Sequence, residues 1–262
     1  MSGVDKFRKY LESSEGVQVS GSGEVTVGKA VVKISGSGRY VEGEILKVSG
    51  AAKVDGDVKV RMMSVSGSFK SNGSINAETV KIAGAAKILG SLKARVLSVA
   101  GALKISGDLD VETAKIAGAA KLGCGKFDLL KIDGALRAET IEASKFILGL
   151  EGFSQVKTIK ADFVEVKRVR KPFVKVGPFE ISFKKGLNLR VSIHEKGVKL
   201  EAGKIKALKA ELESVTCEEL YAGIAVIGDE CHIKRLYYSE SYEVSDKARV
   251  DEVVKVKDIS NA

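Results

Sequence analysis

The apolar residues of this chain return in columns at a short and nearly constant period. The first column contains Val48, Val65, Ile82, Val99, Ile116 and Ile132. Each of these residues is followed two positions later by a glycine, and the glycines lie 17 positions apart until the last interval, which is 16. A fixed period this short is typical of a solenoid, in which each repeat forms one turn and stacks on the next.

Within each repeat the pattern predicts strands. Apolar and polar residues mostly alternate, as they do in a strand that buries one face. The glycines punctuate these runs and permit the corners that β-branched residues resist. One repeat is too short for a strand, a helix and two loops, but it is long enough for three short strands. The sequence therefore predicts an all-β fold, a right-handed parallel β-helix, whose handedness follows the general rule for parallel crossovers.

The regularity of the pattern divides the chain into four parts. Residues 17–150 carry the regular repeat, and Val19-Ser20-Gly21 and Ile34-Ser35-Gly36 resemble shorter turns of the same series. Residues 151–196 still alternate but lack the glycine columns, so they predict an irregular β segment. A looser β-helical pattern resumes over residues 197–262.

Residues 1–16 form the fourth part. Val4, Phe7 and Leu11 share one face of a short helix, with Tyr10 beside them. Such a helix can cover the edge of the first turn, or it can touch a membrane surface. We favour the cap.

The charge of the chain indicates a possible class of binding partner. The chain carries a formal net charge of +9, and the window from Lys157 to Arg190 holds ten basic residues against three acidic ones. An anionic membrane or a nucleic acid could bind such a patch. The alternative is a solvated strand face, which we favour. The candidate binding residues are Lys167, Arg168, Arg170, Lys171, Lys184 and Lys185.

The sequence shows no pattern that predicts catalysis, a cofactor or a metal site. His194 and His232 are the only histidines and lie in unrelated contexts. Cys124, Cys217 and Cys231 contain no C-x-x-C pair, so a tetrahedral metal site is not expected. The stretch Gly21–Ala30 lacks the spacing of a phosphate-binding loop. We therefore expect a protein that is not an enzyme and has no small-molecule substrate.

Several rungs of the predicted helix resemble those of the bactofilins, which are polymer-forming cytoskeletal proteins. The resemblance rests on the rungs "AAKVDGDVKV", "AAKILGSLKA" and "ALKISGDLDV", and on the closing stretch "GDECHIKRLYYSESYEVSDKARVDEVVKV". The closing stretch resembles that of longer bactofilin-like proteins with two β-helical parts. The resemblance implies a right-handed β-helix that polymerises end to end without a nucleotide and serves as a scaffold.

Open sheet edges agree with that implication, because unpaired backbone groups on a terminal rung can pair with another copy. The candidate polymer interface consists of Val19, Val25, Val27, Val250, Val253, Val254 and Val256. The partner is then the protein itself, with a membrane surface or client proteins as further partners and nucleic acid as the less favoured one. The alternative is a monomeric or dimeric β-helical adaptor that binds an anionic membrane or nucleic acid through residues 157–190.

The ends and composition of the chain predict a cytoplasmic protein, with association with a membrane left open. Residues 1–16 contain no apolar core of a signal peptide, and no apolar run is long enough to form a membrane-spanning helix. Few Asn and Gln residues accompany many Lys and Glu residues, which is typical of proteins from thermophiles.

Overall fold

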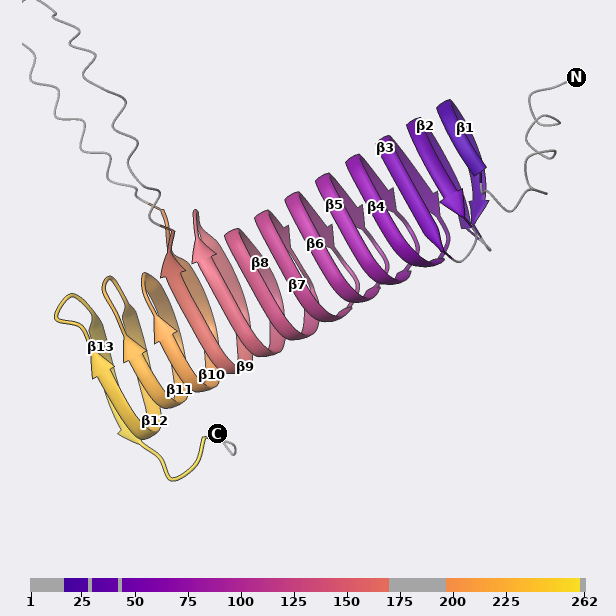
Figure 1. Cartoon of the computed structure of the whole chain (residues 1–262). Helices are drawn as coiled ribbons and strands as arrows, with labels where there is room; N and C mark the ends of the chain where they lie inside the picture. The colour runs from indigo at the N-terminus through magenta and orange to yellow at the C-terminus, as the bar shows by residue number, and fades with distance from the viewer. Residues whose placement is uncertain (1–16, 28–29, 42–43, 170–196, 260–262) are drawn as a thin grey trace, which may run out of the picture.

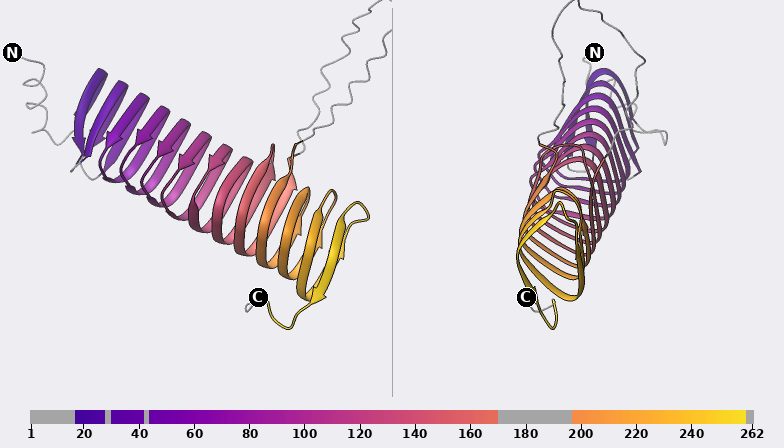
Figure 2. Two further views of the ribbon diagram at one scale, coloured as in Figure 1. Left: turned by 180° about the vertical axis from the view of Figure 1, so that it is seen from behind. Right: turned by 90° about the vertical axis from the view of Figure 1, so that its left-hand side faces the viewer.

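The computed structural model describes residues 17–27, 30–41, 44–169 and 197–259. The regular elements of these residues are all strands, and the strands form a single sheet that winds along a rod (Figure 1). The solenoid has about 11 turns that lie roughly 17 residues apart. Each strand bends around the rod, so that a view from near one end shows the turns stacked behind one another (Figure 2).

The strands follow one another along the rod in chain order. They are β1 (Val17–Val27), β2 (Ala30–Val41), β3 (Ile45–Asp55), β4 (Val58–Ser71), β5 (Ile75–Ile88), β6 (Leu92–Ile105), β7 (Leu109–Lys121), β8 (Cys124–Leu150), β9 (Ser154–Arg168), β10 (Leu200–Leu212), β11 (Val215–Ile227), β12 (His232–Val244) and β13 (Arg249–Lys255). The long β8 pairs with β7 through its first half and with β9 through its second.

The core is built from the columns that the sequence predicts. Val65 pairs with Ile82 and Ile82 with Val99, so each side chain lies directly on its counterpart in the next rung. Every member of the column from Val48 to Ile132 is at most 2% exposed. The alternation within each strand is equally clear, because β5 and β6 share the same order of buried and exposed positions. The parallel β-solenoid and its inward-facing residues are therefore confirmed.

The glycine column is required by the close approach of neighbouring rungs. Gly84 has a φ of +130°, which side chains rarely permit. A Cβ atom added at Gly84 would lie 2.2 Å from the carbonyl oxygen of Gly67. Only glycine therefore allows the rungs to stack at the normal spacing of about 4.8 Å at this corner.

The first strands differ from the prediction. β1 pairs with β2 and β2 with β3 in antiparallel directions, and parallel pairing begins between β3 and β4. The glycines are aligned as expected, since Gly21 pairs with Gly36 and Gly36 with Gly50. The interpretation of residues 17–41 as shorter parallel turns is wrong. These three glycines follow one another at shorter intervals than the glycines of the regular repeat, and the chain reverses instead of completing a turn.

The middle of the chain also differs from the prediction. Residues 154–168 do not form an irregular segment, because β9 pairs in parallel register with β8 on one side and with β10 on the other. Ser154 pairs with Leu200 and Ile159 with Ile205, so β10 continues the stack directly. The regular repeat and the later β-helical segment thus form one continuous solenoid. Residues 170–196, the rest of the predicted irregular segment, lie outside the described residues, as do residues 1–16.

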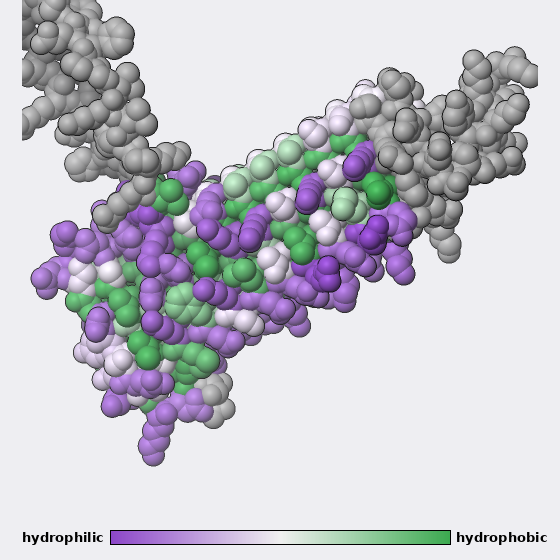
Figure 3. All heavy atoms as spheres, in the orientation of Figure 1, coloured by the Kyte–Doolittle hydropathy of each residue, from purple (hydrophilic) through white to green (hydrophobic). Residues whose placement is uncertain are grey.

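The surface repeats as regularly as the core. In Figure 3, hydrophilic and hydrophobic residues form separate rows that run along the rod, because equivalent positions of successive rungs lie side by side. Among the described residues, the structure contains no helix that is long and apolar enough to cross a membrane. The surface of the solenoid thus consists of these rows along its sides and of its two ends.

Candidate assembly and binding surfaces

The C-terminal end of the solenoid leaves its apolar core open. Ile205, Leu220 and Leu236 form one column in successive rungs, and each is fully buried. The next member of the column is Val253 on β13, and 41% of this residue is exposed. The exposure follows from position alone, because no further described rung covers Val253.

The last rung is also incomplete. β13 has seven residues and pairs with β12 only as far as Tyr238, so the second half of β12 contacts β11 but has no described strand on its other side. Tyr242 and Val244 continue the buried positions of Ala225 and Ile227, yet both are exposed. Together with Val253 they form the apolar C-terminal face. This face combines open core columns with a free sheet edge, the two features that allow another strand to add.

The predicted C-terminal interface residues lie at this end. Val250, Val253 and Val254 are on β13, and Val256 follows it directly. Val250 packs partly against Ile233, whereas Val254 continues the column of the stacked rings of Tyr221 and Tyr237. Sequence reasoning missed Tyr242 and Val244, because nothing in the pattern shows that β13 stops halfway along β12.

The predicted N-terminal interface lies on the opposite edge strand. Val19, Val25 and Val27 belong to β1, which is the first strand of the sheet, but their side chains lie outside the described part of the structure. The predicted cap or membrane residues Val4, Phe7, Tyr10 and Leu11 also lie outside the described residues. Among the described strands, β1 and β13 stand at the two ends of the sheet.

The described part of the predicted basic patch is largely neutralised within the molecule. Lys167 lies 2.6 Å from Glu165 and 3.4 Å from Glu211, and these carboxylates raise the pKa of the lysine. Arg168 pairs with Glu230 at 2.7 Å. The patch up to residue 169 thus resembles a solvated face stabilised by ion pairs between rungs, which is the alternative that we favour from the sequence. The other four candidates, Arg170, Lys171, Lys184 and Lys185, lie outside the described residues.

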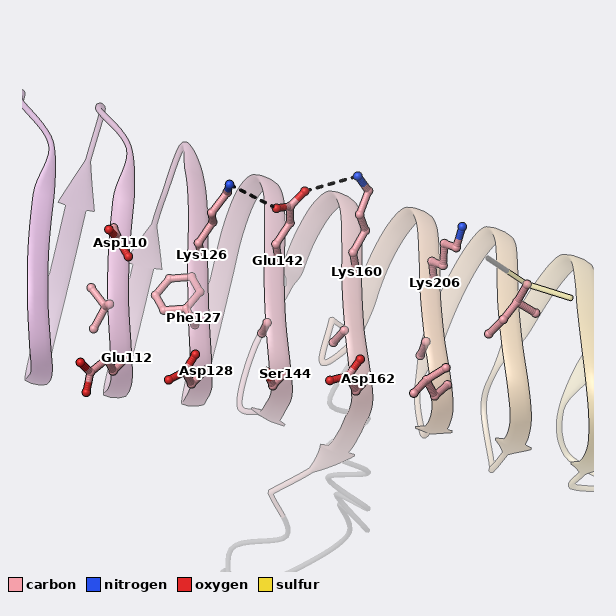
Figure 4. A pocket seen from close by; sticks show the side chains of 16 residues that line it. Asp110, Glu112, Lys126, Phe127, Asp128, Glu142, Ser144, Lys160, Asp162 and Lys206 are labelled. Carbon is pink, nitrogen blue, oxygen red and sulfur yellow. Dashed lines mark hydrogen bonds and ion pairs between the residues drawn. The ribbon is translucent and has the colours of Figure 1, made fainter. Parts of the chain in front are cut away.

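A groove of about 640 Å³ runs across β7 to β10 on the side of the rod (Figure 4). In the upper row, Glu142 is held between Lys126 at 4.0 Å and Lys160 at 3.3 Å. A lower row contains Glu112, Asp128, Ser144 and Asp162, and the ring of Phe127 lies between the rows. The groove has no histidine or cysteine among its lining residues. Its central carboxylate, Glu142, is paired with two lysines from neighbouring rungs.

The cysteines and His232 are not gathered into a site. Cys217 and Cys231 are buried, and burial raises the pKa of the Cys217 thiol to about 12 and that of Cys231 to about 11. Cys231 donates weakly to the carbonyl oxygen of Leu212, and His232 contacts Asp251 at 2.9 Å. In the described ranges, no three His, Cys, Asp or Glu side chains could hold a metal ion together. These thiols are unreactive members of the core.

A further surface, which sequence reasoning missed, is a column of basic residues on the outside of the rod. Outward-facing basic residues occupy one column of the repeat over six rungs, namely Lys53, Lys70, Lys87, Lys104, Lys121 and Arg137. The signal was their recurrence at the period of the glycine column. The pattern alone does not show whether acidic residues from neighbouring rungs neutralise them.

No protein-family model matches the chain, and searches of curated proteins and of solved structures find no similar protein. The resemblance to bactofilins therefore stays a prediction from the rungs themselves. The β-solenoid is consistent with a structural scaffold.

Proposed function

We propose that this protein is a non-enzymatic, bactofilin-like scaffold whose solenoids join end to end into filaments without a nucleotide. The observation that carries the proposal is the open C-terminal face. A column that is fully buried from Ile205 to Leu236 ends at the exposed Val253, and no described strand pairs with the outer edge of β13.

A second copy stacked on this face would both pair the edge of β13 and cover the exposed apolar side chains. The free N–H and C=O groups of β13 gain partners, and the side chains of Val253, Tyr242 and Val244 leave water. Full burial of one such aliphatic side chain contributes about 1.5–3 kcal/mol. The contact repeats the interaction that already holds the rungs together, so it needs no bound nucleotide.

Growth of a filament beyond two molecules requires a second contact, at the other end of the rod. β1 is the strand at that end of the described sheet, and with its edge left open by residues 1–16 the molecule has two joining ends and forms an extended polymer instead of a closed dimer. A cap formed by residues 1–16 would instead limit assembly to pairs joined through the C-terminal face. A filament built from such contacts has a scaffold's main property, a long surface on which every subunit presents the same rows of side chains.

The adaptor alternative receives less support from the described residues. Lys157, Lys160, Lys167 and Arg168 each form an ion pair with a glutamate, so this part of the basic patch has little free charge to offer. Binding through residues 157–190 would depend on the part that lies outside the described residues.

Negative-stain electron microscopy of the purified full-length protein, without nucleotide and at low and high salt, tests the proposal. We expect filaments under both conditions, because apolar contacts and backbone hydrogen bonds are little affected by screening. Discrete particles at both salt concentrations would contradict it. Filaments that dissolve at high salt would contradict the apolar contact.

Variants of the last rung test which contact joins the copies. Replacing Val250 or Val254 with Lys should shorten the filaments, since a charge would enter the contact between rungs. Unchanged filaments would exclude the C-terminal end as an interface. A folded but non-assembling variant would distinguish a failed contact from a failed fold, and circular dichroism is the check.

A further inference from the structure

A row of outward-facing basic residues runs along β4 to β8. Lys70 pairs in register with Lys87, Lys87 with Lys104 and Lys104 with Lys121, and Arg137 follows on the next rung. All five side chains are exposed. Successive rungs are about 4.8 Å apart, so the row is straight and about 19 Å long. We call these five residues the basic row.

The basic row is not neutralised by the molecule itself. Within the described residues, none of its five side chains forms an ion pair or a hydrogen bond. The positions two residues before and after the four lysines carry no acidic group, and they are Ser68, Ala85, Ala102, Ala119, Asn72, Leu89, Ser106 and Gly123. Acids lie near the two ends of the column: Lys53 pairs with Asp55 at 2.9 Å and lowers the pKa of that carboxyl, and Glu139, two residues after Arg137, pairs with Lys157 at 2.6 Å. The four lysines therefore face solvent without an acidic neighbour at these positions, and Arg137 forms no ion pair with a described residue.

At several other exposed positions, charges of opposite sign are paired between rungs. Glu44 pairs with Arg61 on the next rung at 2.7 Å, Lys93 pairs with Asp110 at 2.8 Å, and Glu218 pairs with Lys234 at 2.7 Å. Neighbouring like charges on a sheet destabilise it, so the basic row carries a cost that these pairs avoid. Residues that lower the stability of a fold, as these like charges do, are expected at functional sites.

The shape of the surface selects the kind of anion. Small residues such as Ala85, Ala102 and Ala119 line a groove of about 620 Å³ beside the row, so the five cationic groups stand above their surroundings. Phe153, at one end of this groove, is the aromatic residue exposed there, whereas single-stranded nucleic acid is usually bound by several aromatic side chains that stack on its bases. Duplex phosphates wind around their axis, so a straight row meets few of them. The headgroups of a lipid surface form a plane of mobile charges, which all five residues can reach together.

We propose that the basic row docks the solenoid lengthwise on an anionic lipid surface. Apart from Leu89 and Phe153, the residues beside the row are small or polar, so the attachment is mainly electrostatic and weakens as salt rises. A single chain carries the whole row, and the inference does not depend on end-to-end assembly.

Sedimentation of the full-length protein with lipid vesicles tests this proposal. Vesicles of phosphatidylcholine with added phosphatidylserine should bind the protein at low salt, and vesicles of phosphatidylcholine alone should not. The combined substitution Lys70→Gln, Lys87→Gln, Lys104→Gln and Lys121→Gln should weaken binding by a factor of about 100 or more, since each basic residue near an anionic surface contributes about fivefold.

A matched control removes the same charge elsewhere. Lys47, Lys59, Lys81 and Lys115 are also exposed and have no ion pair with a described residue. Their combined replacement with Gln should leave vesicle binding within a few-fold of the original. Equal losses in both variants would show that net charge alone matters and would overturn the proposal.

Two further results would also overturn it. One is the absence of binding by the unaltered protein at low salt. The other is binding of a duplex DNA fragment that depends on the basic row while vesicle binding does not, which would identify the ligand as nucleic acid. Thermal unfolding should show that the variant without the basic row folds at least as stably as the original, because its mutual repulsion is relieved.

Discussion

The same core column behaves differently in the middle of the rod and at its C-terminal end. Leu236 and Val253 are adjacent members of the column, yet Leu236 is fully buried and Val253 is 41% exposed. The difference does not come from the residue type, because both are aliphatic and point the same way. It comes from the absence of a described rung beyond β13. A solenoid stabilises each turn through its neighbours, so its last turn is a binding surface unless something covers it.

The largest expected difference between these regions is in the effect of a buried charge. Leu236→Asp should lower the free energy of unfolding by more than about 4 kcal/mol, because an unpaired carboxylate would enter the core. Ile82→Asp should do the same in the first half of the rod. Val253→Asp should cost less than about 1 kcal/mol, since water reaches this position. Denaturant unfolding at a protein concentration too low for assembly measures all three. Similar costs at 236 and 253 would mean that the C-terminal face is covered.

Two glycines have nearly the same backbone conformation but differ in whether a neighbouring rung packs against them. Gly84 and Gly197 have φ angles of +130° and +129°, but a Cβ atom would clash with Gly67 only at Gly84 and has nothing within 4 Å at Gly197. Both alanine variants carry backbone strain of about 1–3 kcal/mol. Gly84→Ala should cost about 1–3 kcal/mol more, because the neighbouring rung must move. Thermal unfolding of the two variants gives the difference. Equal losses would show that the contact between rungs is not what requires glycine.

Ion pairs between rungs should give the smallest effect. Lys209 and Lys167 lower the pKa of Glu211 below its ordinary value of 4.5, so the folded state holds this proton less tightly than the unfolded state. The stabilisation is therefore complete above pH 4.5 and is lost as the pH falls through the folded pKa.

Glu211→Gln should lower stability by less than about 1 kcal/mol at pH 7, and the difference should vanish in acid. Unfolding followed as a function of pH measures it. Glu252→Gln, at an exposed position on β13 with no ion pair to a described residue, is the control and should change nothing. A difference that persists in acid would mean that packing, and not charge, explains the effect.

The sequence predicts the rungs well because each rung is a local unit. The column from Val48 to Ile132 and the glycines beside it identify the inward face without any knowledge of the rest of the chain. The pairing of Ser154 with Leu200 is different, because a long stretch of chain separates the two residues and no period links them. The antiparallel start was missed for a similar reason, since the aligned glycines Gly21 and Gly36 do not reveal the direction of their strands.

The candidate surfaces were predictable to different degrees. The valines of β13 could be placed at the C-terminal end, because they are the last apolar residues of the repeat. The exposure of Tyr242 depends on where β13 stops along β12, which is a tertiary property. The basic row has a clear period in the sequence, but its significance depends on the neutral neighbours that the register brings beside it.

The most direct test of end-to-end assembly compares two substitutions at equally exposed aliphatic residues. Val253 and Leu89 are both 41% exposed, but Val253 lies on the C-terminal face, whereas Leu89 lies on the side of the rod between β5 and β6. Filament lengths of Val253→Lys and Leu89→Lys should be measured by electron microscopy under identical conditions. We expect short particles from Val253→Lys and filaments of normal length from Leu89→Lys. Filaments of normal length from Val253→Lys, or equal loss in both variants, would contradict assembly through the C-terminal face.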